Sequence, residues 1–484
     1  MWRVRNMKTK RWAHLFNIYS NYYIYDAGRN TILKIDKDAF ELLKQEKDEN
    51  EQTDNVIEEI ENDGFLCPSN IQEIEHPFTE MLPFYLNRKL KSIVLQVTQN
   101  CNLRCKYCIY SGGYNNRLHN CKDMSPDIAM RGIDYLVDHS IDQSEINLGF
   151  YGGEPLLKFD LIQDCIQYIE NIADGKKITF NLTTNGTLLT KRIIEYFISK
   201  NVRIVISLDG PQSIQNTNRV FINGSGTFEA VYKNLSMIQQ CYPDYYKSNL
   251  SFNTVLDPKN SFNCINQYFS SDPLFRESSF NSSIISTRYK KESLDYSENF
   301  ETELNYEIFK LYLSKMGKIS AGDASKLLKG QYENINRKLG GKQNSIIDNT
   351  NTKAHRSGPC IPGKRLFLNC EGTFFPCERV SESSDSMKIG SVYSGIDVQK
   401  CSKLLNIGKI SEERCKKCWA FWFCNLCAGD ADDLQGLSEN VLQQQCVEVK
   451  KGVDNMLKDY CALRENGHDF QFSMCYKDYS EQEA

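Results

Sequence analysis

The sequence has few histidines and no strong excess of either charge. Only six of its 484 residues are His, and the His-Glu-x-x-His pattern of hydrolytic zinc enzymes does not occur. Its 58 Lys and Arg side chains nearly balance 62 Asp and Glu, which leaves a net charge of −4. A chain without a basic excess has no electrostatic reason to bind nucleic acid. We therefore expect neither a hydrolytic zinc centre nor a nucleic-acid partner.

Long apolar segments are also lacking. No apolar run is long enough to span a bilayer, and residues 1–5 do not begin the apolar core of a signal peptide. We therefore expect a cytoplasmic protein without a membrane partner, in a compartment that keeps thiols reduced. The length is typical of two or three domains.

Cysteine, by contrast, is abundant. The chain has 19 cysteines, and an odd number in a reducing compartment argues against a disulfide framework and for bound metal. Three of them, Cys101, Cys105 and Cys108, follow directly on the apolar, strand-like run 92–98. Asparagines on both sides of Cys101 favour a turn at this point.

Three interpretations of this cysteine stretch are open. Positions i, i+4 and i+7 share one helix face and could form a core stripe, although a helix would spread the outer pair over roughly 10 Å of its axis. A structural zinc ion needs four ligands, and Cys121 is the nearest further cysteine in the chain. Three thiolates on a loop suit a four-iron cluster that keeps one iron open for another ligand.

The stretch 101–108, with Tyr107 just before its last cysteine, resembles the signature of radical S-adenosylmethionine (radical SAM) enzymes. In that family three cysteines hold a [4Fe–4S] cluster, and SAM chelates the fourth iron. The resemblance implies that Cys101, Cys105 and Cys108 are the ligands of this cluster.

Strand-like and helix-like segments alternate from residue 91 onward. The expected strands are 92–98, 145–151, 178–184, 203–208, 249–255 and one near 283–288, and the expected helices are 126–138, 157–172, 190–199, 227–240 and 261–269. Alternation at this spacing implies a parallel sheet. The count, together with the resemblance, predicts an α/β fold with a partial (βα)6 barrel over residues 91–290. Active-site residues should then lie at the carboxyl ends of the strands.

Small and polar residues follow these expected strands. Glycines after the second strand let the backbone approach a ligand closely, and each later polar turn could also be an ordinary cap. The family's Gly-Gly-Glu motif binds the amino group of SAM, and its later turns line the SAM pocket. The resemblance implies a SAM-binding set of Tyr107, Gly152, Gly153, Glu154, Thr184, Asn185, Ser207, Asp209 and Arg219. Gln215 and Asn216 stand where the family often has His-Asp.

Residues 1–90 predict a small α+β domain with strands near 15–19, 22–25 and 31–35 and two short helices. This pattern resembles the winged-helix peptide-recognition element of enzymes that modify ribosomal peptides, which holds a leader peptide as an added strand. A plain extension that packs on the barrel is the alternative. Residues 291–355 predict a helical bridge.

The region 356–484 is rich in cysteine and resembles the SPASM extension of radical SAM peptide and protein modifiers, which carries two auxiliary four-iron clusters. The resemblance assigns Cys415, Cys418, Cys424 and Cys446 to the second auxiliary cluster. It assigns Cys360, Cys377 and Cys427 to the first, with Cys370 as a candidate fourth ligand. Without Cys370, that cluster would have an open iron for a substrate thiolate. Two Cys-x2-Cys knuckles, at 415–418 and 424–427, could instead form a zinc site. No role is assigned to Cys401, Cys461 or Cys475.

These patterns predict a radical SAM peptide maturase with three [4Fe–4S] clusters. The resemblance implies cleavage of SAM to a 5′-deoxyadenosyl radical, with flavodoxin or ferredoxin as electron donor. It further implies thioether crosslinks, from cysteine sulfur to carbon, in a ribosomally made precursor peptide whose leader is bound by residues 1–90. Carbon–carbon crosslinking and formylglycine maturation of a sulfatase share every motif. A zinc or iron–sulfur scaffold that binds peptides is the non-enzyme alternative. Glu378, beside Cys377, is a candidate general base or a salt-bridged surface glutamate.

Overall fold

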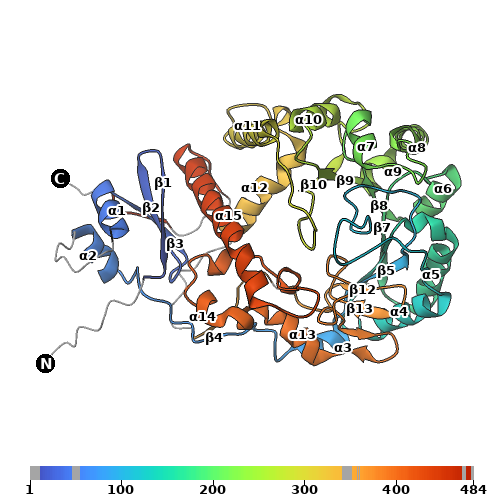
Figure 1. Ribbon diagram of the computed structural model, residues 1–484, viewed down its shortest axis with the longest axis horizontal. Helices are drawn as coiled ribbons and strands as arrows, with labels where there is room; N and C mark the ends of the chain where they lie inside the picture. Colours follow the sequence, from blue (N-terminus) through green and yellow to red (C-terminus); the bar gives the residue numbers. More distant parts are fainter. Residues whose placement is uncertain are drawn as a thin grey trace.

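A small sheet at one end of the molecule, a long helix in the middle and a larger α/β unit at the other end make up the architecture (Figure 1). The computed structural model describes residues 11–45, 55–340, 352–356, 358, 360–470 and 476–480. Cys475, to which the sequence assigned no role, lies outside these residues. No helix among them is long and apolar enough to cross a membrane.

The small sheet contains the strands and helices predicted for the amino-terminal region. Strands β1 (Ala13–Ile18), β2 (Asn21–Asp26) and β3 (Thr31–Ile35) form an antiparallel meander. Helices α1 (Lys37–Lys44) and α2 (Asn55–Asn62) follow, and the Asp36 side chain caps α1 by accepting from the Ala39 amide at 2.8 Å. The free edge of β3 is not open, because β16 (Tyr476–Asp478) pairs with it in parallel.

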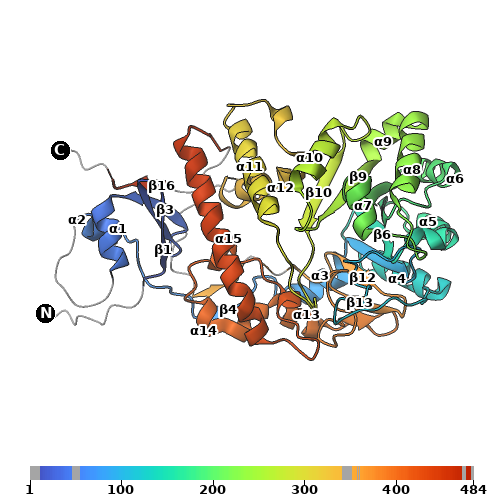
Figure 2. The ribbon, with the colours of Figure 1, turned by 45° about the horizontal axis from the view of Figure 1, so that its top comes forward.

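The six strands predicted for the barrel are present, and all are parallel. They are β5 (Ser92–Thr98), β6 (Glu145–Gly152), β7 (Lys177–Thr184), β8 (Arg203–Ser207), β9 (Leu250–Leu256) and β10 (Ser279–Ile284). The predicted helices are α4 (Pro126–Asp138), α5 (Phe159–Ile172), α6 (Lys191–Ser199), α8 (Phe228–Cys241) and α10 (Phe262–Ser271). Helices α4, α5, α6 and α8 line the outer rim with the strands inside (Figure 2).

The parallel sheet buries a continuous apolar core. Strand β5 is almost entirely buried because it lies in the middle of the sheet, as expected for a strand covered on both faces. Strand β10, predicted near 283–288, begins earlier, at Ser279. It is a polar edge strand, so hydrophobic pattern does not mark its position.

The cysteine-rich region extends the same sheet. Strand β12 (Leu366–Leu368) pairs in parallel with β5. It continues through the antiparallel strands β13 (Thr373–Phe375), β14 (Gly390–Ser391) and β15 (Gly395–Ile396). Residues that follow β13 return to the carboxyl end of β5, where Gln96 and Gln99 both donate to the Glu382 carboxylate.

Helices connect these parts. In the predicted bridge lie α11 (Glu298–Lys315) and α12 (Lys329–Ile335), and the carboxyl-terminal region contributes α13 (Val398–Leu405), α14 (Glu412–Cys415) and α15 (Glu439–Glu465). The remaining elements are β4 (Glu73–Ile74), α3 (Leu82–Arg88), α7 (Gln212–Asn218), α9 (Pro243–Asn249) and β11 (Lys353–Ala354).

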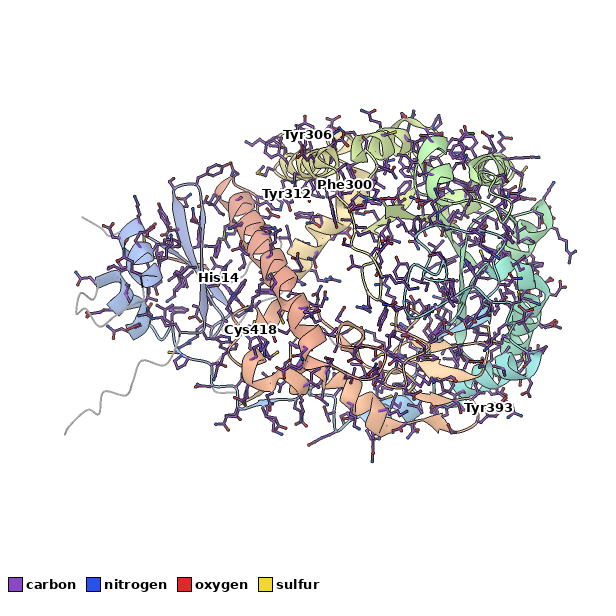
Figure 3. All side chains as sticks on the ribbon, in the orientation of Figure 1. His14, Phe300, Tyr306, Tyr312, Tyr393 and Cys418 are labelled. Carbon is purple, nitrogen blue, oxygen red and sulfur yellow. The ribbon has the colours of Figure 1, made fainter. Side chains whose placement is uncertain are left out.

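Helix α15 joins the small sheet to the rest of the molecule. His14 Nε2 lies 2.8 Å from Asp454 Oδ1 on one side of α15, and Tyr312 donates to Asp459 Oδ2 at 2.7 Å on the other. Figure 3 shows the labelled side chains of His14 and Tyr312 on opposite sides of this helix. Contacts with α15 thus fix the small sheet to the rest of the molecule.

Candidate functional site

The cysteine loop 101–108 starts just beyond the carboxyl end of β5, where a parallel barrel places its site. Its backbone is fixed by two hydrogen bonds, from the Arg104 amide to the Val220 carbonyl at 2.7 Å and from the Lys106 amide to the Asn218 carbonyl at 2.9 Å. These bonds hold the loop against the turn that follows α7, so the loop has a defined shape.

The three loop thiols lie within one another's electrostatic reach. Burial, with smaller contributions from Glu154 and the other two thiols, raises the pKa of Cys101 to about 12, and burial raises the pKa of Cys105 to about 11. Metal binding deprotonates such thiols and would supply the missing counter-charge. One buried and two half-buried thiols on one loop therefore fit a metal-bound thiolate set.

The geometry does not describe a single-ion site. Within the described ranges, no three Cys, His, Asp or Glu side chains are arranged to hold one metal ion. A four-iron cluster places each thiolate on a separate iron, so its ligands do not converge on one point.

Glu154 lies beside the cysteine loop and is completely buried. Its Oε1 accepts from the Leu156 amide at 3.1 Å and the Thr184 hydroxyl at 2.7 Å, while Oε2 accepts from the Asn185 amide at 2.7 Å. Burial raises the pKa of the Glu154 carboxyl, and these donors oppose that rise. A carboxylate has about four acceptor positions, so three donors leave room for one more, such as an ammonium.

The two glycines before Glu154 pack directly against backbone. Gly152 has φ +145°, and a Cβ there would lie 2.1 Å from the Thr98 carbonyl oxygen. A Cβ on Gly153 would lie 2.1 Å from the Asn100 carbonyl oxygen. One close approach that requires glycine here is to the backbone that leads into Cys101. The glycines set how closely the β6 turn packs on the cysteine loop.

Asp209 and Arg219 form a buried ion pair at the end of β8. Arg219 Nε donates to Asp209 Oδ2 at 2.9 Å, and its guanidinium lies 5.3 Å from the centre of the Tyr107 ring. The Tyr107 hydroxyl donates to the same carboxylate, and Arg219 also lies in the electrostatic neighbourhood of Cys105. Three residues of the predicted SAM set are thus joined, and Ser207 ends β8 just before them.

Gln215 explains the departure from the family's usual His-Asp pair in structural terms. It is fully buried; its Oε1 accepts from the Asp209 amide at 2.9 Å, and its Nε2 donates to the Thr227 hydroxyl at 3.3 Å. Gln215 therefore fixes the backbone of Asp209 and does not point to a ligand.

Four carboxyl-terminal thiols gather into a second group. The thiols of Cys415 and Cys424 lie in the electrostatic neighbourhood of both Cys418 and Cys446. These are the four residues assigned by resemblance to the second auxiliary cluster. The buried guanidinium of Arg356 donates to Cys424 Sγ at 3.6 Å, so the group fits an anionic centre.

Two thiols of the other predicted auxiliary set are also neighbours. Cys377 lies in the electrostatic reach of Cys427, whose Sγ accepts from Arg288 at 3.9 Å. Cys360 is exposed. Cys370 is held elsewhere, because its buried thiol donates to the Gln96 carbonyl at 3.0 Å. The structure therefore groups Cys377 with Cys427 and places Cys370 against β5.

Cys401 and Cys461, which had no assigned role, are core residues. Cys401 is fully buried on α13, and Cys461 is 1% exposed on α15. Cys121 is exposed.

A cluster of buried polar atoms beside the cysteine loop was missed by the sequence reasoning. Among the described residues, no partner is found for Nε and Nη1 of Arg117, both ring nitrogens of His119, Oδ1 of Asn116 and Oε2 of Glu378. Arg117 lies 5.6 Å above the ring of Tyr110, two residues beyond Cys108. Buried polar atoms are nearly always paired, so such a concentration marks a place for a polar ligand.

These atoms are held in place by contacts between the cysteine loop and the region after β13. Arg117 Nη2 donates to the Val380 carbonyl at 2.6 Å and lies 3.2 Å from Glu382 Oε1. Gln96 and Gln99 both donate to the Glu382 carboxylate, at 2.8 and 3.1 Å. Gln96 could have been noticed in the sequence, because it is a polar residue inside an otherwise apolar strand.

The sequence left open whether Glu378 is a general base or a salt-bridged surface residue, and the structure shows features of both. Its Oε1 pairs with Arg365 at 3.0 Å, but its side chain is only 12% exposed and Oε2 is buried. It is therefore salt-bridged without being a surface residue.

Known proteins show related sequences and a related fold. Residues 95–267 match the family model described as the radical SAM superfamily. The radical SAM cyclopropyl synthase TigE of Paramaledivibacter caminithermalis is 27% identical over 46% of this chain and 47% of its own length. A cysteine-type anaerobic sulfatase-maturating enzyme of Clostridium novyi is 24% identical over 60% of this chain and 74% of its own.

The matched regions differ in extent. The chain spans about half the length of TigE and of a relative from Methanocaldococcus jannaschii. A solved structure, native anSMEcpe with bound AdoMet, is 18% identical, with a TM-score of 0.56 over 77% of this chain and 99% of the other. A likeness at this identity shows a shared fold, and it covers more of the chain than the matched residues 95–267.

Proposed function

Because this chain carries a radical SAM domain over residues 95–267, we propose that it is a peptide maturase that installs thioether crosslinks in a ribosomally made precursor peptide. Members of this superfamily are enzymes, and the family implies SAM and one [4Fe–4S] cluster. The peptide substrate, the thioether product and two auxiliary clusters are the parts that go beyond the family.

The observation that carries a peptide substrate is the group of unpartnered polar atoms around Arg117. A peptide backbone offers carbonyl and amide groups that could pair with Arg117, His119 and Asn116. The group is built partly by residues 116–119, which follow the cysteine loop, and partly by residues after β13. Arg117 lies in the electrostatic neighbourhood of Cys108, so a ligand there would lie beside that cysteine. A solved structure of similar fold, anSMEcpe, contains a bound peptide as well as AdoMet, and two proteins of related sequence are anaerobic sulfatase-maturating enzymes.

The cysteine geometry favours a thioether over the alternatives. With Cys370 held against β5, the first auxiliary set has Cys360, Cys377 and Cys427 as candidate ligands. A cluster with three protein thiolates has one iron open, and a substrate cysteine is a suitable fourth ligand. Its sulfur would then be positioned to bond a neighbouring carbon.

The protein's own residues would bind the cluster and SAM and orient them for the reaction. Cys101, Cys105 and Cys108 would hold the first cluster, and the fourth acceptor position of Glu154 suits the ammonium of SAM. When bound, cluster and SAM supply a 5′-deoxyadenosyl radical, which is chemistry that the cofactors carry. The Asp209–Arg219 pair fixes the orientation of Tyr107 within the cysteine loop.

The atoms and electrons of thioether formation balance as follows. To form the carbon–sulfur bond, the peptide must lose one hydrogen atom from the carbon, one proton from the cysteine thiol and one electron. The 5′-deoxyadenosyl radical would accept the hydrogen atom, and an auxiliary cluster held by the carboxyl-terminal cysteines would be able to accept the electron. Glu378, with one buried oxygen free of partners among the described residues, is the candidate acceptor for that proton. Flavodoxin or ferredoxin is the proposed donor of the electron that starts each turnover.

A leader peptide remains the proposed ligand of residues 1–90. In the structure the β3 edge, where an added strand would pair, is paired with β16. A leader that uses this edge must therefore replace β16.

The test uses the full chain, reconstituted anaerobically with iron and sulfide, together with SAM, dithionite and, as probes, synthetic cysteine-containing peptides translated from the short reading frames next to its gene. We expect 5′-deoxyadenosine and a peptide that has lost two hydrogens per crosslink and whose crosslinked cysteines resist iodoacetamide. Retained alkylation with the same mass loss would indicate carbon–carbon crosslinking, and an aldehyde would indicate formylglycine. Absence of 5′-deoxyadenosine would refute the enzyme assignment.

The polar group is tested separately by Arg117→Met. We expect this variant to cleave SAM without peptide as the parent does but to lose peptide modification. Arg88→Met, which removes an exposed arginine paired with Asp142, is the matched control and should behave as the parent.

A further inference from the structure

Arg356 is the most completely buried arginine of the described chain, and its charge has no carboxylate partner there. The residue is 1% exposed, and among the described residues no acidic side chain forms an ion pair with it. Its Nη1 donates to Cys424 Sγ, whereas Nε and Nη2 find no hydrogen-bond partner in the described structure. Arginine stays protonated in proteins, so a full positive charge is buried with only a thiol beside it.

A buried charge without a counter-charge is strongly destabilising. The Arg356 side chain is also enclosed, because only 1% of the residue is exposed and its Nε and Nη2 atoms are buried. The guanidinium therefore cannot easily swing toward solvent. An anion that accepts hydrogen bonds has to lie on its free side.

The groups around Arg356 identify the anion. Cys424 is its direct partner, and Arg356 also lies in the electrostatic neighbourhood of Cys446. Cys415 and Cys424 are in turn neighbours of Cys418 and Cys446. Once deprotonated by metal, four thiolates around an iron–sulfur core carry net negative charge and present sulfurs that accept N–H donors.

Other cations near these thiols are placed differently. Lys338 Nζ donates to the Phe423 carbonyl at 3.2 Å, and Lys417 is exposed between Cys415 and Cys418. An exposed lysine is screened by water, whereas a buried guanidinium acts at full strength.

We propose that Arg356 is a positioning residue that neutralises the iron–sulfur centre held by Cys415, Cys418, Cys424 and Cys446, and raises its reduction potential through N–H donors to its sulfurs. Donors and positive charge stabilise the more negative, reduced form of such a centre. This inference rests on the auxiliary cluster of the proposed function, but not on the substrate or the product.

The experiment compares Arg356→Met, Arg356→Lys and Lys417→Met in the full chain, with Cys101, Cys105 and Cys108 changed to Ala so that only auxiliary centres contribute. Iron and zinc are counted after anaerobic reconstitution, and the reduced centres are titrated by electron paramagnetic resonance. We expect Arg356→Met to retain less iron and to shift one of the auxiliary signals to lower potential. Arg356→Lys, which keeps the charge and loses the planar fork of donors, should fall between Arg356→Met and the parent. Lys417→Met, which removes the same charge in water, should match the parent.

Unchanged iron content and potentials in Arg356→Met would overturn the proposal, as would one equivalent of zinc in place of iron in the parent. If Arg356→Met does not fold, the potential of Arg356→Lys decides: a shift supports the proposal and an unchanged value overturns it. Failure of the proposed function is distinguishable, because it would appear as missing 5′-deoxyadenosine or unmodified peptide in the unmutated chain. The auxiliary signals would still respond to Arg356.

Discussion

Replacement of Gly153 by Ala tests the packing on which the cysteine loop depends. The new Cβ would lie 2.1 Å from the Asn100 oxygen, 2.5 Å from its carbonyl carbon and 2.9 Å from the Gln99 oxygen. All three atoms belong to backbone, so no side chain can move aside. The Asn100 carbonyl would have to retreat by roughly 1 Å to reach an ordinary contact, and Asn100 directly precedes Cys101.

Two magnitudes follow from that displacement. Overpacking in a tight region costs about 1–3 kcal/mol of unfolding free energy. For a unit the size of the barrel, this corresponds to a fall of about 2–12 °C in the unfolding midpoint. A misplacement of about 1 Å at a reacting centre can cost about 10²-fold in rate. The assay is anaerobic formation of 5′-deoxyadenosine from SAM without peptide, combined with iron content and thermal unfolding.

The matched control is Gly452→Ala on α15, where a Cβ meets nothing within 4 Å. Alanine in a helix is favoured over glycine by about 0.5–1 kcal/mol, so this variant should be as active as the parent and slightly more stable. If Gly153→Ala showed parental iron content, rate and midpoint, the argument that the glycines fix the cysteine loop would be wrong.

Three further predictions concern single residues. Glu154→Gln removes the charge that accepts the SAM ammonium, and because hydrogen bonds to charged groups contribute about 1.5–3 kcal/mol, SAM should bind about 10- to 100-fold more weakly in equilibrium dialysis. Cys370→Ala should keep parental iron content whereas Cys377→Ala should lose iron; equal losses would make Cys370 a ligand. Burial, aided by the charge of His355, lowers the pKa of His76 from 6.5 to about 4, and its Nδ1 accepts from the Phe78 amide. The unfolded chain therefore binds a proton that the folded chain excludes, and stability should fall as the pH drops below 6.5. His76→Gln should show a weaker fall between pH 7 and 5 in thermal unfolding, and identical slopes would contradict the assignment.

Much of the barrel could be predicted because its strands and helices are long and strongly patterned. Helix α4 lies at the predicted residues, with Ser125 as its cap and Pro126 at its first position, which are local signals. The parallel topology also places Glu154, Asn185 and Asp209 at the carboxyl ends of their strands. The sequence therefore predicted that these residues lie close together.

The unpredicted features depend on contacts between distant segments. Strand β12 has three residues, and nothing in its own sequence specifies pairing with β5. Arg356 looks like any polar loop residue until the fold encloses it beside Cys424. The glycines before Glu154 had the right residue type, but the atom that they accommodate, the Asn100 carbonyl, is only identified once β5 and β6 are paired.

The pairing of β16 with β3 makes the assembly of the small sheet a late event. Leu33 and Lys477 are register partners, and Tyr479, 9% exposed, donates to Asp63 Oδ2 at 2.6 Å. A chain made from its amino end upward exposes the β3 edge throughout synthesis of the barrel and the cysteine-rich region, since domains fold as they emerge. A fusion tag or a protease cut near residue 476 would therefore disturb the small sheet, even though strands β1 to β3 of that sheet are synthesised first. Tags that should not affect folding are better placed elsewhere on the surface.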